Sequence, residues 1–248
     1  GGDTASALAA GCPVIVKSHP MHAGTGEIVS RAIINAVEKN NMPDGVFSMF
    51  YGSGRTIGQA LVKHSSIKAG GFTGSTHAGR LLFDIAANRK EPIPFFAEMG
   101  SVNPTIILPE AVRNNSDKIA TSLAGSINLG AGQFCTNPGL VLLIKTNGYD
   151  KFIDKLNDAI SYAEPGVMLN KNIFNSYESD KEYLLNEPGV KFLSKSKSRK
   201  NNLNVGLPTL ATVEANTFLK NSKLSKEIFG PFSLLVLCSD IEELQKVI

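Results

Sequence analysis

Cysteine is scarce in this sequence, and the few cysteines form no recognisable pattern. The 248 residues include three, Cys12, Cys135 and Cys238, which cannot all pair with one another. None has metal-ligand spacing with the histidines, so we expect neither a disulfide framework nor a metal centre. Unpaired thiols are typical of a reducing compartment, which predicts a cytoplasmic protein. Cys12 and Cys238 are flanked by apolar runs and are expected to be inert core thiols.

Long apolar runs and blocks of one charge are also missing. No apolar stretch approaches the roughly 18 residues that a membrane-spanning helix needs. The formal net charge of +3 is spread along the chain, which predicts neither a nucleic acid nor a membrane as partner. The start at Gly1 and the end at Ile248, inside an expected helix, lead us to expect an internal fragment of a longer protein.

The sequence does contain an alternation of strand-like and helix-like segments. Apolar segments at 13–17 and 46–50 are typical of strands, the first buried on both faces, and the segment 24–39 between them is typical of an amphipathic helix. Such alternation predicts a parallel α/β sheet. A second α/β domain is expected to begin near Gly100, which divides the chain into residues 1–99 and 100–248.

Two glycine-rich turns follow strands in the first part. One, with Gly52, Gly54 and Gly58, opens a helix, and the other, at Gly74 and Ser75, opens a helix that ends near Asn88. Glycine at a strand-to-helix turn lets a pyrophosphate approach the N–H groups of the helix N-terminus. Neither turn has the spacing G-x-G-x-x-G, so the alternative interpretation, simple turn formation, stays open.

Cys135 lies in the stretch GAGQFCTNPG, residues 130–139. It follows an expected helix at 115–129 and precedes an expected strand at 140–144, so its thiol is predicted to be exposed in a turn. A turn of open N–H groups can lower the pKa of a thiol and stabilise an oxyanion, which is typical of a nucleophile. The alternative is a small apolar residue in a tight loop.

Glu98 closes an apolar run in the stretch PFFAEMGSVNP. A carboxylate at the end of an apolar strand can lose water and act as a general base. The alternative is a strand-end glutamate that faces solvent.

Taken together, EMGSVNP and GQFCTNPG resemble the two active-site signatures of the aldehyde dehydrogenase superfamily. The resemblance extends through Lys17, the Gly52–Gly58 turn, the F-T-G-S motif at 72–75 and the E-I-F-G-P motif at 227–231. It implies an aldehyde dehydrogenase-like α/β fold, with a partial Rossmann-type dinucleotide-binding domain at 1–99 and a partial catalytic domain at 100–248. The implied reaction is oxidation of an aldehyde through a thiohemiacetal and a thioester on Cys135, with Glu98 as general base.

The resemblance also implies a set of cofactor-binding residues. Lys17 and His19 would hold the adenosine ribose and its phosphate, Gly74 and Ser75 the pyrophosphate, and Glu227 and Phe229 the nicotinamide riboside. The full implied set is Lys17, Ser18, His19, Gly54, Gly58, Thr73, Gly74, Ser75, Met99, Glu227 and Phe229.

This sequence departs from the family pattern in ways that bear on the cofactor and on completeness. Many NAD-preferring members have a glutamate three residues after the lysine, where this chain has Pro20. Without that carboxylate a 2′-phosphate is not repelled, so NADP is the expected cofactor, with NAD possible. The oxyanion asparagine of the family would precede Gly1, and the whole enzyme is expected to have on the order of 500 residues and to form a homodimer or tetramer.

The residues of these motifs resemble those of the 2-oxoglutarate semialdehyde dehydrogenase branch. The resemblance therefore implies a small aldehyde of that kind as the substrate and partner. A fatty-aldehyde dehydrogenase and a truncated nucleotide-binding module without turnover are the alternatives. A CoA-acylating enzyme is disfavoured because such enzymes generally lack the glutamate that matches Glu98.

Overall fold

The computed structural model describes residues 2–198 and 203–248, which form two compact units. The first unit is Gly1–Gly100 and the second is Ser101–Ile248. No helix in the described part of the chain is both long enough and apolar enough to cross a membrane.

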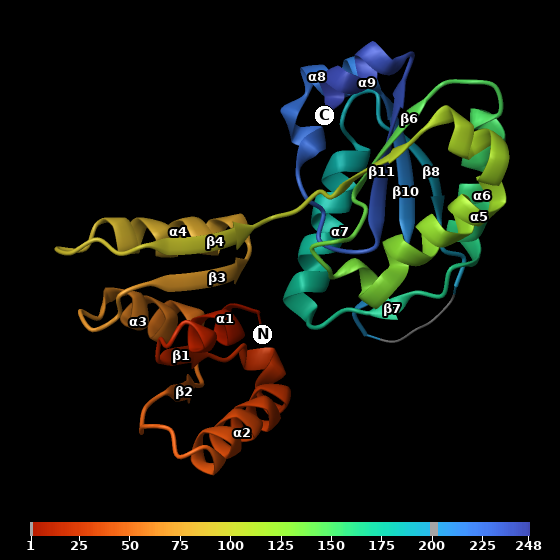
Figure 1. Cartoon of the computed structure of the whole chain (residues 1–248). Coiled ribbons are helices and arrows are strands. Elements are labelled where there is room, and N and C mark those ends of the chain that lie inside the picture. Colours follow the sequence, from red (N-terminus) through yellow and green to blue (C-terminus); the bar gives the residue numbers. More distant parts are fainter. Residues whose placement is uncertain (1, 199–202) are drawn as a thin grey trace. The chain divides into compact units, whose positions relative to one another are not determined.

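Short strands and helices alternate through the first unit (Figure 1). Its strands form two parallel pairs, β1 with β2 and β3 with β4. Its elements are α1 (Gly2–Ala9), β1 (Val14–Lys17), the 3-10 helix η1 (Pro20–His22), α2 (Ala23–Lys39), β2 (Phe47–Phe50), the π-helix η2 (Gly54–Gly58), α3 (Gln59–Lys63), β3 (Gly70–Gly74), α4 (Thr76–Ala87) and β4 (Phe95–Met99).

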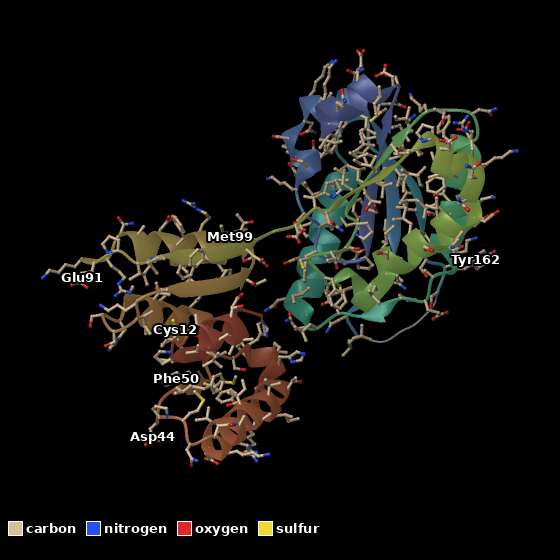
Figure 2. The ribbon with its side chains drawn as sticks, viewed as in Figure 1. Cys12, Asp44, Phe50, Glu91, Met99 and Tyr162 are labelled. Carbon is tan, nitrogen blue, oxygen red and sulfur yellow. The ribbon has the colours of Figure 1, made fainter. Side chains whose placement is uncertain are left out.

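Two expectations for the start of the chain are wrong. The strand β1 is not buried on both faces, because it has a single neighbouring strand and Ile15 is 43% exposed. Cys12, labelled in Figure 2, is exposed between α1 and β1 and is not a core thiol. Cys238 is buried as expected, and desolvation raises the pKa of its thiol to about 11.

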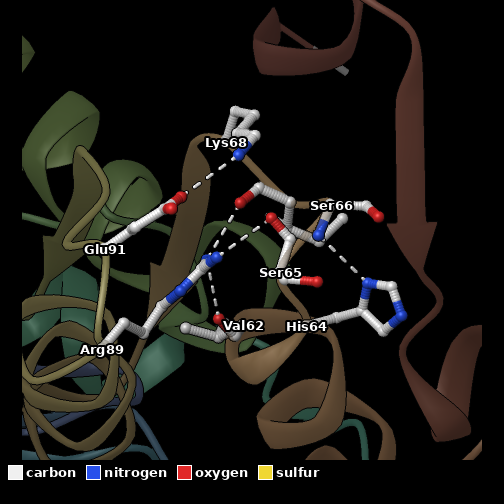
Figure 3. A network of polar contacts seen from close by, with 8 residues as sticks. Val62, His64, Ser65, Ser66, Lys68, Arg89 and Glu91 are labelled. Atoms are coloured by element: carbon white, nitrogen blue, oxygen red, sulfur yellow. Dashed lines mark hydrogen bonds and ion pairs between the residues drawn. The ribbon is translucent and has the colours of Figure 1, made fainter.

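Arg89 ties together the segment between α3 and β3 (Figure 3). Its Nη1 donates hydrogen bonds to the carbonyl oxygens of Val62 at 3.1 Å and Ile67 at 2.9 Å, and its Nη2 donates to that of Ser65 at 3.4 Å. A cation at the C-terminal end of a helix satisfies carbonyls that have no partner within the helix. Arg89 therefore serves the fold of this unit.

The second unit is a five-stranded sheet between two layers of helices (Figure 1). The strand order is β5-β6-β11-β10-β8, and the pairs are parallel except that β8 runs antiparallel to β10. Its elements are β5 (Pro104–Ile107), α5 (Pro109–Asn128), the 3-10 helix η3 (Leu129–Gly132), β6 (Leu140–Ile144), α6 (Tyr149–Tyr162), β7 (Gly166–Val167), α7 (Lys171–Leu185), β8 (Lys191–Lys195), β9 (Val205–Gly206), β10 (Thr209–Glu214), α8 (Ala215–Lys220), the 3-10 helix η4 (Ser222–Ser225), β11 (Phe232–Cys238) and α9 (Ile241–Val247).

Strand β6 shows how the sheet divides the core. Leu140, Leu142 and Ile144 pack into a cluster with residues of α7, α8 and α9, and Val141 and Leu143 pack into another with residues of α5 and α6. This is the alternation that a strand buried on both faces requires. Every residue of β6 is buried, so the turn that precedes it is attached to the centre of the sheet.

Candidate active site

The turn that carries Cys135 begins where α5 ends. Gly130, Ala131 and Gly132 all have positive φ, of 58°, 56° and 67°, and this reverses the chain direction after the helix. Glycine adopts such a conformation without steric cost, whereas Ala131 adopts it under strain. Cys135 follows in a turn and is exposed, as a nucleophile requires.

Side chains from the EMGSVNP stretch bind the backbone carbonyls of this turn. Ser101 Oγ donates to the carbonyl oxygen of Cys135 at 2.6 Å, and Asn103 Nδ2 donates to that of Thr136 at 2.6 Å. The amide N–H of Cys135, by contrast, has no hydrogen-bond acceptor among residues 2–198 and 203–248. The turn is thus held through its carbonyls, while the N–H beside the thiol stays available to a ligand.

Gln133 fixes the start of the same turn from within. Its Nε2 donates to the carbonyl oxygen of Gly130 at 3.0 Å, and its Oε1 accepts from the backbone N–H of Leu169 at 2.9 Å. Both ends of the amide are therefore satisfied, which restricts the backbone on the N-terminal side of Cys135.

The E-I-F-G-P segment lies beside the turn in the same unit. Ile228 and Gly230 are buried, whereas Phe229 is 37% exposed and Glu227 is half-buried. The side chains of Glu227 and Phe229 are therefore accessible to solvent. Partial burial raises the pKa of Glu227, and the backbone amide of Ser101 offsets part of that rise. A pocket is shared by the two segments, and its lining includes Ser101, Phe134, Asn137, Lys226, Glu227 and Phe229.

Five of the predicted cofactor residues in the first unit lie at the carboxyl end of the β1–β2 pair. Lys17 ends β1, and Ser18 after it is buried and donates its N–H to the carbonyl oxygen of Phe50 at 2.8 Å. The π-helix that contains Gly54 and Gly58 contacts β1. Partial desolvation lowers the pKa of Lys17. His19 is exposed, and its Nδ1 accepts from the N–H of Met21 at 3.2 Å.

The other predicted residues of this unit lie at the carboxyl end of the β3–β4 pair. Thr73 is in register with Glu98, and Gly74 with Met99, which Figure 2 labels at the end of β4. Ser75 caps α4, because its Oγ accepts from the N–H of Ala78 at 3.4 Å. Met99 packs against α4, where a Cβ on Gly79 would overlap its side chain.

Within its own unit, Glu98 lies on the outward side of β4. Its side chain is exposed in β4, so the residues of its own unit do not remove it from water. The alternation of β4 explains this, because Phe95, Ala97 and Met99 are partly buried while Phe96 and Glu98 face outward. The alternative interpretation, a glutamate facing solvent, describes Glu98 within this unit.

Sequence reasoning passed over three residues that organise the turn, Ser101, Asn103 and Asn137. All three lie inside the two motifs that drew attention to Cys135 and Glu98. Short polar side chains in Gly- and Pro-rich turns commonly form hydrogen bonds with nearby backbone groups. This pattern in the sequence could have indicated all three residues.

A model of the aldehyde dehydrogenase family matches residues 1–248. The chain belongs to this family. The expected superfamily and α/β fold are therefore confirmed.

Two curated relatives of the chain are alpha-ketoglutaric semialdehyde dehydrogenases. The chain is 47% identical to alpha-ketoglutaric semialdehyde dehydrogenase 2 of Azospirillum brasilense, over 100% of its own length and 47% of the relative's. It is 43% identical to alpha-ketoglutaric semialdehyde dehydrogenase of Acinetobacter baylyi, over 97% of the chain and 45% of the relative. The chain thus spans about half the length of the curated relatives it matches.

Solved structures share the fold at lower identity. An NAD-dependent benzaldehyde dehydrogenase from Corynebacterium glutamicum has a TM-score of 0.79 at 23% identity, over 98% of this chain and 52% of that one. A glyceraldehyde-3-phosphate dehydrogenase from Methanocaldococcus jannaschii, complexed with NADP, has a TM-score of 0.79 at 23% identity, over 97% of this chain and 51% of that one.

Proposed function

We propose that the protein carrying this chain oxidises 2-oxoglutarate semialdehyde to 2-oxoglutarate, with Cys135 as nucleophile and NADP as electron acceptor. The observation that carries the proposal is the state of the Cys135 turn. Its thiol is exposed, its carbonyl oxygen is bound by Ser101, and its N–H has no acceptor in the described residues. The substrate is supported by the identity of 47% and 43% to proteins named for this semialdehyde.

The chemistry begins at the sulfur atom of Cys135. The thiolate attacks the aldehyde carbon and forms a C–S bond, while the carbonyl oxygen becomes an oxyanion that accepts a hydrogen bond from the Cys135 N–H. A bound nicotinamide cofactor would supply the hydride acceptor for this step, and the carbon on the Cys135 sulfur would then be a thioester. Water then attacks the thioester, the C–S bond breaks, and the carboxylate leaves. One aldehyde, one water and one oxidised cofactor give one carboxylate, one reduced cofactor and two protons.

Glu98 would accept the proton of the attacking water. A general base has to reach that water and to hold a pKa suited to the task. The Glu98 carboxylate is exposed at the end of β4, so water can reach it.

The residues of the first unit fit a dinucleotide phosphate. Lys17 is a partly desolvated cation without an ion-pair partner among the described residues, so a phosphate would supply its missing counter-charge. The N-terminus of α4 offers backbone N–H groups beside Gly74 and Ser75. Lys17 and His19 would hold the adenosine phosphate, Gly74 and Ser75 the pyrophosphate, and Glu227 and Phe229 the nicotinamide ribose.

The test is formation of the reduced cofactor by the natural polypeptide that carries this sequence. Wild type, Cys135→Ser and Glu98→Gln are compared on 2-oxoglutarate semialdehyde and on a long-chain aldehyde, with Cys12→Ser as the control for loss of an exposed thiol. We expect no turnover with Cys135→Ser, a burst followed by slow turnover with Glu98→Gln, and wild-type rates with Cys12→Ser.

Each other outcome has a definite meaning. A higher kcat/KM on the long-chain aldehyde would replace the proposed substrate with a fatty aldehyde. Binding of NADP without reduction by any aldehyde would overturn the proposal in favour of a nucleotide-binding module without turnover.

A further inference from the structure

We propose that Asn137 is a positioning residue that fixes the E-I-F-G-P segment relative to Cys135, so that the nucleophile and the nicotinamide end of the cofactor move as one body. The inference rests on the proposed function, in which Cys135 attacks the aldehyde and Glu227 and Phe229 hold the nicotinamide riboside. It assigns a role to a side chain that the chemistry itself does not use.

The contact that carries the inference joins two distant parts of the chain. Asn137 is 8% exposed, and its Nδ2 donates a hydrogen bond to the carbonyl oxygen of Gly230 at 2.9 Å. Asn137 follows Cys135 by two positions, and Gly230 follows Phe229 directly. This single side chain therefore links the nucleophile turn to the segment proposed to hold the cofactor.

The orientation of the amide is determined by its surroundings. With the opposite orientation the Oδ1 atom would face the oxygen of Gly230, and two acceptors would repel each other. In the observed orientation Oδ1 is buried and meets no hydrogen-bond donor in the described parts of the chain. A half-satisfied buried amide costs stability, so stability alone does not explain an asparagine at this position.

Close backbone packing makes the link rigid. Gly132 has a φ of 67°, and a Cβ on it would overlap the backbone of Gly230 and Pro231. On the other side, a Cβ on Gly230 would overlap the ring of Tyr177, whose hydroxyl donates to the carbonyl oxygen of Leu207 at 2.6 Å. Gly230 is thus held by Gly132, Asn137 and Tyr177 at once.

Rigidity here matters because the reaction is sensitive to distance. A misplacement of about 1 Å between reacting groups can lower a rate by roughly a hundredfold. Without the Asn137 amide, Gly230 keeps its backbone contacts and the N–H of Phe232, which donates to its oxygen at 2.8 Å. The segment then stays folded, but its position relative to Cys135 is less sharply defined.

The experiment compares Asn137→Ala and Asn137→Ser with Thr212→Val in the natural polypeptide that carries this chain. Thr212 in β10 is a matched control, because its Oγ1 also makes a buried hydrogen bond to a backbone carbonyl, that of Leu235 in β11 at 3.1 Å. Three quantities are measured: kcat and the KM for NADP, the isotope effect on kcat with an aldehyde deuterated at its carbonyl carbon, and the rate of Cys135 alkylation by iodoacetamide with and without NADP.

We expect both Asn137 variants to lower kcat by roughly tenfold or more with less than a threefold change in KM for NADP, and to raise the isotope effect. The response of Cys135 alkylation to NADP should be present in wild type and Thr212→Val and lost in both Asn137 variants. Asn137→Ser tests the idea if Asn137→Ala fails to fold.

Failure of this inference differs from failure of the proposed function. Wild-type kcat, isotope effect and alkylation response in the Asn137 variants of an active enzyme would overturn the inference alone. Suppose that wild type shows no turnover, but NADP still changes its rate of Cys135 alkylation and does not change that rate in the Asn137 variants. This result would overturn the proposed function alone. No alkylation response in wild type, with Asn137 variants that match Thr212→Val, would also overturn the inference.

Discussion

The hydroxyl of Ser101 donates a hydrogen bond to the backbone carbonyl of Cys135 across 2.6 Å. Ser101 belongs to the EMGSVNP motif, three positions after Glu98, and Cys135 belongs to the GQFCTNPG motif. The hydrogen bond therefore joins the two motifs at the residue proposed as nucleophile. The bond polarises the peptide group of Cys135 and limits rotation of the turn. It therefore bears on how the thiol is presented to a substrate.

Replacing Ser101 tests this contact. Ser101→Ala removes the bond, which we expect to cost about 0.5–1.5 kcal/mol of unfolding free energy and to lower kcat/KM for the aldehyde by roughly threefold to tenfold. Ser101→Thr keeps the hydroxyl and should stay near wild type. Steady-state kinetics and the alkylation rate of Cys135 are the measurements, and unchanged values in Ser101→Ala would show that the bond does not position the thiol.

Gly132 is expected to tolerate no side chain. Gly132→Ala combines a φ of 67° with overlap on the backbone of Gly230, so we expect more than about 2 kcal/mol of destabilisation and loss of turnover. Gly125 in α5 offers the opposite case, because a Cβ there meets nothing within 4 Å. Gly125→Ala should stabilise the helix by roughly 0.5–1 kcal/mol. Chemical unfolding of both variants is the test, and equal effects would refute the packing argument.

Arg89 is predicted to hold the first unit together through backbone carbonyls. Arg89→Leu leaves the oxygens of Val62, Ser65 and Ile67 without their donor, for an expected loss of about 1–3 kcal/mol. Lys68→Ala breaks only the exposed pair with Glu91 at 3.5 Å and should have little measurable effect. Thermal unfolding distinguishes them, and a similar shift for both would argue against the role of Arg89.

Ionisation of the Glu227 carboxyl is predicted to lower the free energy of unfolding. Partial burial raises its pKa from 4.5, so the folded state binds more protons than the unfolded state just above pH 4.5, and stability falls as pH rises there. Glu227→Gln should raise the unfolding temperature at neutral pH, with no gain in acid, while it weakens cofactor binding.

Glu187 provides the control of opposite sign. Hydrogen bonds from Asn221 and Lys223 lower the pKa of Glu187, so its contribution to stability is present at neutral pH and is lost as pH falls through the lowered pKa. Glu187→Gln should therefore lower the unfolding temperature at neutral pH. A pH series of unfolding temperatures in which both variants shift the same way would contradict the assignment.

Pro20 is predicted to govern cofactor preference. It is exposed at the start of the 3-10 helix Pro20–His22. Pro20→Glu should place a carboxylate near a bound 2′-phosphate and raise the KM for NADP by roughly tenfold or more, with a smaller change for NAD. The neutral variant Pro20→Gln should leave the ratio of the two KM values close to wild type. A ratio unchanged by the glutamate would place the phosphate elsewhere.

Local patterns predicted the elements that carry their own periodicity. The strand Leu140–Ile144 has the expected bounds, and the helix expected at 24–39 spans Ala23–Lys39. The helix expected at 115–129 starts earlier, at Pro109, because the chain continues through a non-helical Asn115. The strand Phe232–Cys238 was not assigned, since a short buried apolar run has no period that distinguishes strand from helix.

The features that the sequence could not indicate depend on pairing between strands that are distant in the chain. The separation of β1–β2 from β3–β4 depends on which strands meet, and the local pattern of each strand is the same in either arrangement. Similarly, the contact between Asn137 and Gly230 spans 93 positions and is visible only once β6 and β11 lie side by side.

The burial of every residue in β6 has a kinetic consequence for the turn before it. Amides in a central strand of this kind exchange with solvent only when the whole unit unfolds, whereas a turn held by a few side-chain hydrogen bonds opens far more often. Cys135 lies five positions before the first residue of β6. The turn can therefore open locally and return to the same closed arrangement many times while the strands beneath it stay paired.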